Sequence, residues 1–379
     1  MTVMRILFLA GGSPATIFGL APLATAARNA GHQVFLASTE EMMPVAAGAG
    51  LPGVPVTGRS IRDFMTTSRT GESLQWPEDP QEHIHFIGRG FGRMAADSLP
   101  ALTELGRAWK ADLVVGGMLC FAAPLAARHL GIPYVRQAWD TGEPPEVDGA
   151  AASVMGPELA ELGLDRLPEH DLYVDICPPS LRPADAFDAQ PMRYIPGNGQ
   201  RALEPWMYVP GERRRILVTA GSRVSRHQYF DYVRELARKV GALGTELLVA
   251  VPDDVADELT EGLRHVRAGW MPLDVVAPTC DLVVHHAGGG TALSAMNAGV
   301  PQLLIPNMPK LVPPSRRLVD FGAALMVPDG EDSQDAVVAA CEKILGDSSY
   351  RERSQALAAE IAGMPLPAQV VGALEDLVG

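Results

Sequence analysis

The sequence is short of cysteine, of basic charge and of long uninterrupted apolar runs, and each shortage excludes a class of protein. It has 38 glycines and 32 prolines among 379 residues, too few for a collagen-like or low-complexity chain. No cysteine pair has the C-x-x-C spacing of a metal or redox motif, so we interpret the cysteines as small buried side chains in a reducing compartment. They are Cys120, Cys177, Cys280 and Cys341.

Charge and run length also exclude nucleic acids and membranes as partners. The formal charge is −14, whereas neutralising phosphates requires clustered Lys and Arg. The uncharged residues 6–27 resemble a secretory peptide, but Gly-Gly-Ser-Pro at residues 11–14 interrupts the apolar run. Residues 113–127 are shorter than the roughly 20 residues that a membrane helix needs. We therefore expect a cytoplasmic protein.

Predicted strands and helices alternate along the chain, which is typical of parallel sheets covered by helices on both faces. One predicted helix ends at Ala30 before Gly31, and residues 80–109 form one or two more. Strands are predicted at residues 5–10, 33–37, 112–115, 133–138 and 172–176, then at 215–219, 246–251, 265–270, 282–286 and 302–305.

The pattern of the first strand returns in the second half of the chain. Arg-Ile-Leu-Phe-Leu-Ala-Gly-Gly-Ser at residues 5–13 reappears in outline as Arg-Ile-Leu-Val-Thr-Ala-Gly-Ser at residues 215–222. We therefore predict two Rossmann-like, doubly wound α/β domains. Ligands of such sheets bind outside the carboxyl ends of the strands, so two domains facing a central cleft would suit an enzyme that joins two substrates. The predicted parts are an N-terminal domain (1–200), a linker (201–213), a C-terminal domain (214–362) and a final helical segment (363–379) packing back toward the first domain.

The strand at residues 282–286 ends in two histidines, and three glycines and Thr291 follow it. Glycines let backbone N–H groups approach an anion, and a helix N-terminus favours negative charge. His286 and Thr291 add donors, so a diphosphate fits here; a glycine-rich turn with packed histidines is the alternative. The segment is neither a Walker loop nor a G-x-G-x-x-G fingerprint. Gly-Arg-Gly-Phe-Gly at residues 88–92 comes nearest to the latter, but no strand precedes it.

Several motifs together resemble the donor-site signature of GT-B nucleotide-sugar glycosyltransferases of bacterial natural-product pathways, over essentially the whole chain. They are VRAGWMPL at 266–273, Cys-Asp at 280–281, HHAGGGT at 285–291 and GVPQ at 299–302. Further motifs are similar to the aromatic-polyketide (angucycline, urdamycin-type) C-glycosyltransferases. They are GSPAT at 12–16, RQAWD at 136–140, ICPPSLRP at 176–183, LEPWMY at 203–208 and GMPLP at 363–367.

The resemblance implies a thymidine-diphosphate deoxysugar donor, no cofactor, and attack of an aromatic ring carbon on the anomeric carbon with inversion. It implies main-chain bonds from residues 270–273 to the thymine. No Asp-X-Asp metal motif is present. Where the family often has an Asp-Gln pair for the sugar, this chain reads Asn307-Met308, so we name no sugar contacts. The implied donor residues are Gly221, Ser222, Arg223, Trp270, Met271, Leu273, His286, Gly288, Gly289, Gly290 and Thr291.

For the catalytic pair we choose Asp140 as base and His286 as the group that stabilises the leaving diphosphate. Asp140 follows the strand at 133–138, and Ala138 and Trp139 could desolvate it and raise its pKa. A loop aspartate capping the next turn is the alternative. The acceptor candidates, all in the N-terminal domain, are Ser13, Thr16, Phe64, Trp76, Phe86, Met118 and Trp139.

These candidates have structural alternatives. Thr16 could instead be a helix N-cap, and each apolar candidate could be a core residue. Residues 57–79 have few periodic apolar positions, which predicts a mobile lid. Three other functions stay open: an O-glycosyltransferase, a nucleotide-sugar 2-epimerase with the same layout, and a non-catalytic helper of a partner glycosyltransferase. The partners we expect are small molecules, and a homodimer is compatible with the sequence.

Overall fold

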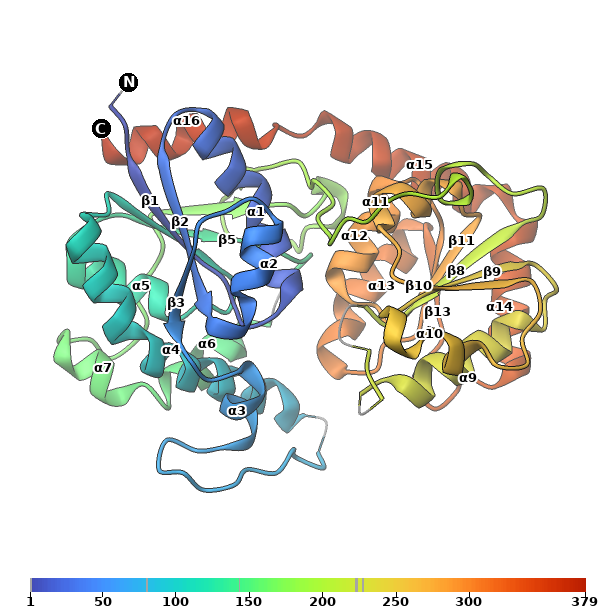
Figure 1. Cartoon of the computed structure of the whole chain (residues 1–379), viewed down its shortest axis with the longest axis horizontal. Helices are drawn as coiled ribbons and strands as arrows, with labels where there is room; N and C mark the ends of the chain where they lie inside the picture. Colours follow the sequence, from blue (N-terminus) through green and yellow to red (C-terminus); the bar gives the residue numbers. More distant parts are fainter. Residues whose placement is uncertain (1, 80, 143, 222–223, 227) are drawn as a thin grey trace. The chain divides into compact units, whose positions relative to one another are not determined.

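The computed structural model describes residues 2–79, 81–142, 144–221, 224–226 and 228–379. Two compact units divide the chain. The first comprises Met1–Cys177, Pro183–Gly197 and Met364–Gly379, and the second comprises Pro178–Arg182 and Asn198–Gly363. Each unit has its own sheet with helices around it, so the predicted α/β class with two doubly wound parallel sheets is correct (Figure 1).

The first unit contains a seven-stranded parallel sheet in the order β3-β2-β1-β4-β5-β6-β7. Its central strands are apolar runs buried on both faces, as parallel strands under helices must be. The strands are β1 (Arg5–Leu9), β2 (Gln33–Thr39), β3 (Gly53–Thr57), β4 (Leu113–Gly117), β5 (Tyr134–Gln137), β6 (Leu172–Asp175) and β7 (Gln190–Pro191). The helices are α1 (Pro14–Asn29), α2 (Met43–Gly48), α3 (Ile61–Thr66), α4 (Glu82–Trp109), α5 (Ala122–Leu130), α6 (Glu146–Ala152), α7 (Gly156–Glu161) and α16 (Pro367–Val378).

The second unit contains a six-stranded parallel sheet in the order β10-β9-β8-β11-β12-β13. Its strands are β8 (Arg215–Thr219), β9 (Glu246–Ala250), β10 (Val266–Gly269), β11 (Leu282–His285), β12 (Gln302–Leu304) and β13 (Ala324–Met326). Its helices are α8 (Pro205–Tyr208), α9 (Phe230–Gly241), α10 (Asp253–Thr260), α11 (Leu273–Val276), α12 (Gly289–Asn297), α13 (Val312–Phe321), α14 (Gln334–Gly346) and α15 (Ser348–Gly363). Short 3-10 turns lie at Glu40–Met42, Pro179–Leu181, Ala277–Thr279 and Pro309–Leu311.

The glycine triplet at residues 88–92 serves helix packing. It lies within α4, a single helix of 28 residues. A Cβ atom added to Gly88 would lie 2.6 Å from the carbonyl oxygen of Val147, and one added to Gly92 would lie 2.7 Å from that of Ala151. The absence of side chains therefore lets α4 approach α6 closely, and the triplet is no phosphate-binding loop.

The C-terminal helix α16 belongs to the first unit, where it runs beside α1 (Figure 1). His32 connects it to the sheet. Its Nδ1 lies 3.2 Å from the Met4 nitrogen and accepts that N–H, so Nε2 carries the proton and donates to Glu375 over 3.0 Å. The first unit is thus completed by residues distant in sequence.

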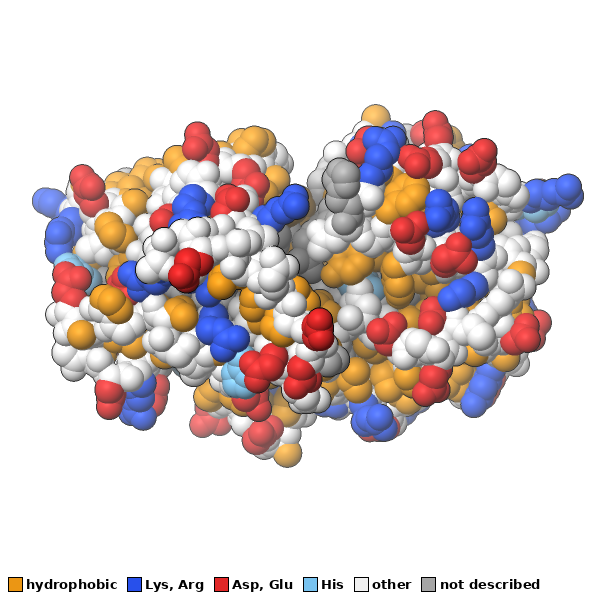
Figure 2. Space-filling view, turned by 90° about the horizontal axis from the view of Figure 1, so that it is seen from below, with side chains coloured by type: hydrophobic (Ala, Val, Ile, Leu, Met, Phe, Trp, Pro, Cys, Tyr) orange, Lys and Arg blue, Asp and Glu red, His pale blue; other side chains and the backbone are white. Residues whose placement is uncertain are grey.

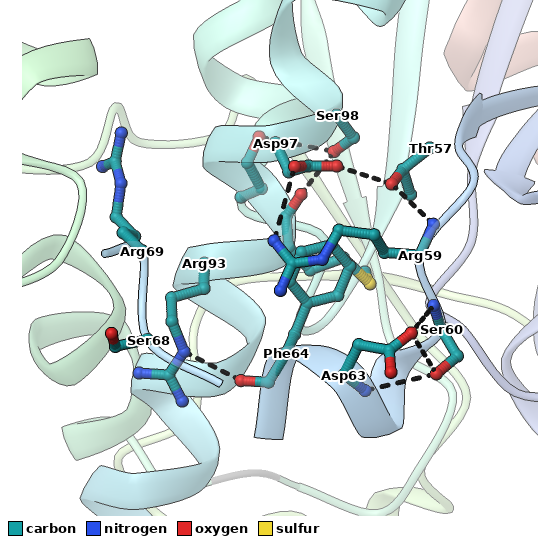
Figure 3. A network of polar contacts seen from close by, with 12 residues as sticks. Thr57, Arg59, Ser60, Asp63, Phe64, Ser68, Arg69, Arg93, Asp97 and Ser98 are labelled. Carbon is teal, nitrogen blue, oxygen red and sulfur yellow. Dashed lines mark hydrogen bonds and ion pairs between the residues drawn. The ribbon is translucent and has the colours of Figure 1, made fainter. Parts of the chain in front are cut away.

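The segment at residues 57–79, predicted as a mobile lid, is tied to its neighbours by polar contacts. Figure 3 shows the start of α3, where Ser60 and Asp63 form a capping box. The Arg93 side chain donates to the carbonyl oxygen of Phe64 over 2.8 Å. Beyond α3, Arg69 makes a two-point ion pair with Glu158 at 2.6 and 2.9 Å. These contacts hold the segment on α4 and α7.

The structure shows where the cysteine and charged side chains lie. All four cysteines are buried and unbonded to one another, as predicted. Figure 2 shows acidic and basic side chains interspersed over the face it presents, with no continuous basic patch among the atoms drawn. Across the described residues, no three His, Cys, Asp or Glu side chains come together in a way that could hold a metal ion.

No single helix in the described part of the chain is both long and apolar enough to cross a membrane; α15 and α16, bent by 44° at the break between them, reach that length and composition only when counted together.

Candidate active site

The start of α12 has the features of an anion site. Gly288 is its N-cap and has no side-chain oxygen that could accept from the first turn. The first N–H groups of any helix lack intrahelical acceptors and carry partial positive charge. A Cβ on Gly290 would meet none of the described residues within 4 Å. Ala287, just before it, has φ 66°, a left-handed conformation that costs energy in a residue with a side chain.

His286 lies directly against this turn. A Cβ on Gly288 would be 2.5 Å from its Nε2, and one on Gly221 would be 3.3 Å from its Cε1. His286 is 8% exposed, and its ring centroid is 6.1 Å from that of Tyr229. The ring therefore lies over the backbone of Gly288 and beside Gly221, where β8 and β11 end. Any side chain at position 288 would displace it.

His285 has a different, structural role. It is fully buried, its Nδ1 accepts the N–H of Ala287 over 3.2 Å, and its Nε2 lies 2.8 Å from the Oε1 of Gln302. Burial lowers its pKa to about 4, against an opposite effect of the hydrogen bond to Gln302. His285 is therefore neutral and fixes the end of β11, whereas His286 is the histidine that lies against the start of α12.

Trp270 follows β10 and is held by protein contacts at each of its polar atoms. Its N–H donates to Asp253 over 2.8 Å, and its carbonyl oxygen accepts from Arg201 over 3.1 Å. The indole Nε1 donates to the carbonyl oxygen of Gly199 over 2.7 Å. The part-buried ring is thus fixed in one orientation.

The main-chain groups of residues 270–273 are less available than the sequence led us to expect. The N–H of Leu273 donates to Asn198 Oδ1 over 2.9 Å, and Pro272 has no N–H. With both main-chain groups of Trp270 also engaged, only Met271 has a main-chain N–H and C=O that bond to none of the described residues. The main-chain N–H groups of Trp270 and Leu273 are therefore engaged within the chain, and the bonding of this segment to a base stays a prediction.

Two more donor-side positions can be placed. Gly221 has φ +81°, a conformation favouring glycine, and its N–H donates to the Thr219 hydroxyl over 3.0 Å. Asn307 follows β12, and its buried Oδ1 makes no hydrogen bond to any residue in the described ranges. The predicted donor residues Ser222 and Arg223 lie outside the described residues.

In the first unit, Asp140 lies just beyond the carboxyl end of β5 and is partly buried. Its Oδ1 accepts the N–H of Thr141 over 2.6 Å. This bond goes to the residue next in sequence, whereas an aspartate that caps a turn bonds to an N–H two or three residues further on. The bond to Thr141 is made by one oxygen of the carboxylate, so it fixes the orientation of Asp140 and leaves the proposed role as base untested.

Trp139 rests on two glycines. A Cβ on Gly117, the last residue of β4, would overlap with Cζ3 and Cε3 of the indole, and one on Gly19 of α1 would lie 2.7 Å from the Trp139 Cβ. Gln137 donates to the carbonyl oxygen of Gly19 over 2.8 Å. The chain just before Asp140 is therefore fixed against α1 and β4.

An ion pair that the sequence analysis did not predict fixes the chain before Asp140 from the side of α6. Arg136 donates to both oxygens of Asp148 in α6, at 2.7 and 2.8 Å, and to the carbonyl oxygen of Met118 over 3.0 Å. The RQAWD motif contains Arg136, so this motif was the signal in the sequence that could have pointed to Arg136. Asp148 could not be found, because only the fold brings α6 to the end of β5.

The other acceptor candidates divide into core and surface. Phe64, Phe86 and Met118 are buried, so they are core side chains, the alternative named for them. Trp76 is 47% exposed and packs edge-on against Phe86. Ser13 is the N-cap of α1, so the N-cap alternative for Thr16 is wrong; the buried Thr16 hydroxyl contacts the carbonyl oxygens of Gly11 and Ser13.

We predict that Gly117→Ala will destabilise the first unit by about 1–3 kcal/mol, because the new methyl group overlaps with the indole of Trp139. Denaturant unfolding measures this. Adding Trp139→Phe should recover part of the loss, since the smaller ring leaves room. Gly372→Ala in α16, where a Cβ meets nothing within 4 Å, is the control. An unfolding free energy for Gly117→Ala equal to that of the wild type would contradict the packing described.

Two family models match most of the chain. Residues 25–221 match the N-terminal domain, and residues 234–377 the C-terminal domain, of the erythromycin biosynthesis protein CIII-like family. Among curated proteins, the L-demethylnoviosyl transferase of Streptomyces niveus is 34% identical over 98% of this chain and 97% of its own length. The 3-alpha-mycarosylerythronolide B desosaminyl transferase of Saccharopolyspora erythraea is 29% identical over 99% and 98%.

Solved structures give the same result. The glycosyltransferase SsfS6 of Streptomyces sp. SF2575, complexed with thymidine diphosphate, has a TM-score of 0.87 and 35% identity, covering 98% of this chain and 99% of that one. The spinosyn rhamnosyltransferase SpnG, complexed with spinosyn aglycone, has a TM-score of 0.85 and 27% identity over 98% and 100%. The chain therefore belongs to the EryCIII-like family, the GT-B glycosyltransferases of antibiotic pathways.

Proposed function

We propose that this chain transfers a deoxysugar from a thymidine-diphosphate donor to an aromatic polyketide, forming a carbon–carbon bond with inversion. The observation that carries the proposal is the glycine-lined start of α12 with His286 against it. Relatives named for sugar transfer, and solved relatives complexed with thymidine diphosphate, support the donor. The RQAWD motif, with its similarity to C-glycosyltransferases, supports the linkage.

The donor diphosphate binds at the start of α12. Its oxygens accept from the first-turn N–H groups, from the Thr291 hydroxyl and from the His286 imidazole. Charge that develops on the leaving phosphate is stabilised there by donors already in place, so transfer needs no metal ion. The alternative interpretation of this segment, a glycine-rich turn with packed histidines, describes His285, because that side chain is neutral and fully buried.

The nucleoside binds along residues 270–273. Thymine stacks on the Trp270 ring, which protein contacts hold in place, and bonds with the main chain of Met271. The sugar extends toward Asn307, whose buried Oδ1 lacks a partner in the described part of the chain and can accept from a sugar hydroxyl. Gly221, Ser222 and Arg223 complete the nucleotide site.

Asp140 acts as general base on the acceptor. It takes the proton of a phenol, and the negative charge spreads to the ortho or para ring carbon. That carbon attacks the anomeric carbon as the bond to the diphosphate oxygen breaks. The ring carbon then loses its proton as aromaticity returns, and Asp140 gives its proton back to the phenolate oxygen, so the products are the C-glycoside, thymidine diphosphate and one proton. Ser13, Trp76 and Trp139 contact the acceptor.

The purified chain, assayed alone with a chelator, a thymidine-diphosphate deoxysugar and a phenolic polyketide, tests this proposal. We expect a product whose sugar survives acid hydrolysis, and tighter binding of thymidine diphosphate than of uridine diphosphate. Release of the sugar by acid would show an O-glycosyltransferase instead. No transfer until a second polypeptide is added would show the helper function. Epimerised nucleotide sugar without transfer would show the 2-epimerase.

A further inference from the structure

Residues 198–201, which directly follow the Pro183–Gly197 part of the first unit, pack on the residues proposed to bind the donor base. Asn198 Nδ2 donates to the Oδ1 of Asp274 over 2.8 Å, while its Oδ1 accepts the N–H of Leu273 over 2.9 Å. Gln200 donates to the other oxygen of Asp274 over 3.1 Å. All of these residues belong to the second unit.

The neighbouring contacts hold Trp270 from the same segment. The carbonyl oxygen of Gly199 accepts from the indole Nε1 over 2.7 Å, and a Cβ on Gly199 would lie 3.3 Å from the ring at Cζ2. Arg201 donates to the carbonyl oxygen of Trp270 and to Asp253, which itself accepts the Trp270 N–H. Trp270 and Leu273 are thus both attached to residues 198–201.

The chemistry at position 198 requires a side chain with both a donor and an acceptor. Leu273 N–H can only donate and the Asp274 carboxylate can only accept, so the partner must present one acceptor and one donor. A primary amide does both at once and can be oriented in only one way here. An aspartate would place a second carboxylate against Asp274, and an alanine would leave both groups without their partner.

We infer that Asn198 is a positioning residue of the donor site: by holding Leu273 and Asp274, it keeps the Trp270–Leu273 segment in the conformation that binds the nucleoside. This inference rests on the proposed function, since it takes residues 270–273 to bind the base. Residues 198–201 are then part of the donor site, although Asn198 itself contacts no substrate.

The test exchanges the donor and the acceptor of the hydrogen bond between Asn198 and Asp274. Asn198→Asp should weaken thymidine diphosphate binding about tenfold by calorimetry and raise the KM for the donor, with the KM for the acceptor unchanged. Asn198→Asp combined with Asp274→Asn places the amide on the other side. The introduced carboxylate then accepts from both Leu273 and the introduced amide, whose oxygen still accepts from Gln200. Binding should return to within threefold of the wild type.

Two further variants separate this role from general instability and from failure of the base site. Ser333→Ala removes the N-cap bond of α14, 3.2 Å long, and should lower thermal stability without changing the Kd of thymidine diphosphate. Trp270→Ala should weaken binding directly. If it does so while Asn198→Asp binds normally, or the double variant is not rescued, the positioning role is overturned. If Trp270→Ala binds normally, the base site and this inference both fail.

Discussion

Replacing His286 by alanine is expected to slow glycosyl transfer about 10²–10³-fold with the fold intact, the usual effect of removing one donor to developing negative charge. The imidazole lies over the backbone of Gly288, at the start of α12, where the leaving diphosphate is proposed to bind. Single-turnover rates with saturating donor measure the effect. His286→Asn keeps a hydrogen-bond donor and should recover part of the loss.

The control for this substitution is His265→Ala, which removes an exposed histidine of the same unit and should leave turnover unchanged. Circular dichroism and thermal unfolding of both variants show whether the fold is retained. A near-normal turnover rate for the His286→Ala enzyme would contradict the proposal that His286 stabilises the leaving diphosphate.

Replacing Asp140 by asparagine is expected to lower turnover about 10²–10⁴-fold, the usual contribution of a general base. A neutral phenol is a poor carbon nucleophile, so attack depends on loss of its proton to the carboxylate. The acidic limb of the rate–pH profile, where Asp140 must be deprotonated, should disappear in the variant. The affinity for thymidine diphosphate should not change, because the proposed donor residues belong to the other unit.

Asp165→Asn, at an exposed carboxylate of the first unit, is the matched control and should behave as the wild type. The amide introduced by Asp140→Asn would keep a side-chain oxygen for the Thr141 N–H, so a purely structural role predicts little loss for this variant. Retained turnover together with an unaltered acidic limb would therefore leave Asp140 as a structural residue and require another base.

The fold could be predicted where strands are central in their sheets. There a strand is buried on both faces, so its sequence is a plain apolar run, as in β1 and β8. The strands missed, β3, β7 and β13, are all at sheet edges. An edge strand pairs on one side only, so it can be as short as two residues or include a proline, as in β7 and β3.

The site could be predicted only where neighbours in sequence are neighbours in space. The rule that ligands bind at the carboxyl ends of parallel strands pointed to Asp140, and the glycine-rich start of a helix pointed to His286 and Thr291. The sequence analysis chose His286 over His285, but only the packed structure shows that His285 is the ring buried against Gln302. Neither rule could link Asn198 to Leu273, whose contact exists only after the segment has docked on the folded unit.

A crystal structure of the whole chain with thymidine diphosphate tests the central claim most directly. We predict phosphate oxygens within hydrogen-bonding distance of the first-turn N–H groups of α12 and of the His286 imidazole, with the thymine on Trp270. A nucleotide bound anywhere else, or an α12 turn closed by protein side chains in the complex, would contradict the account.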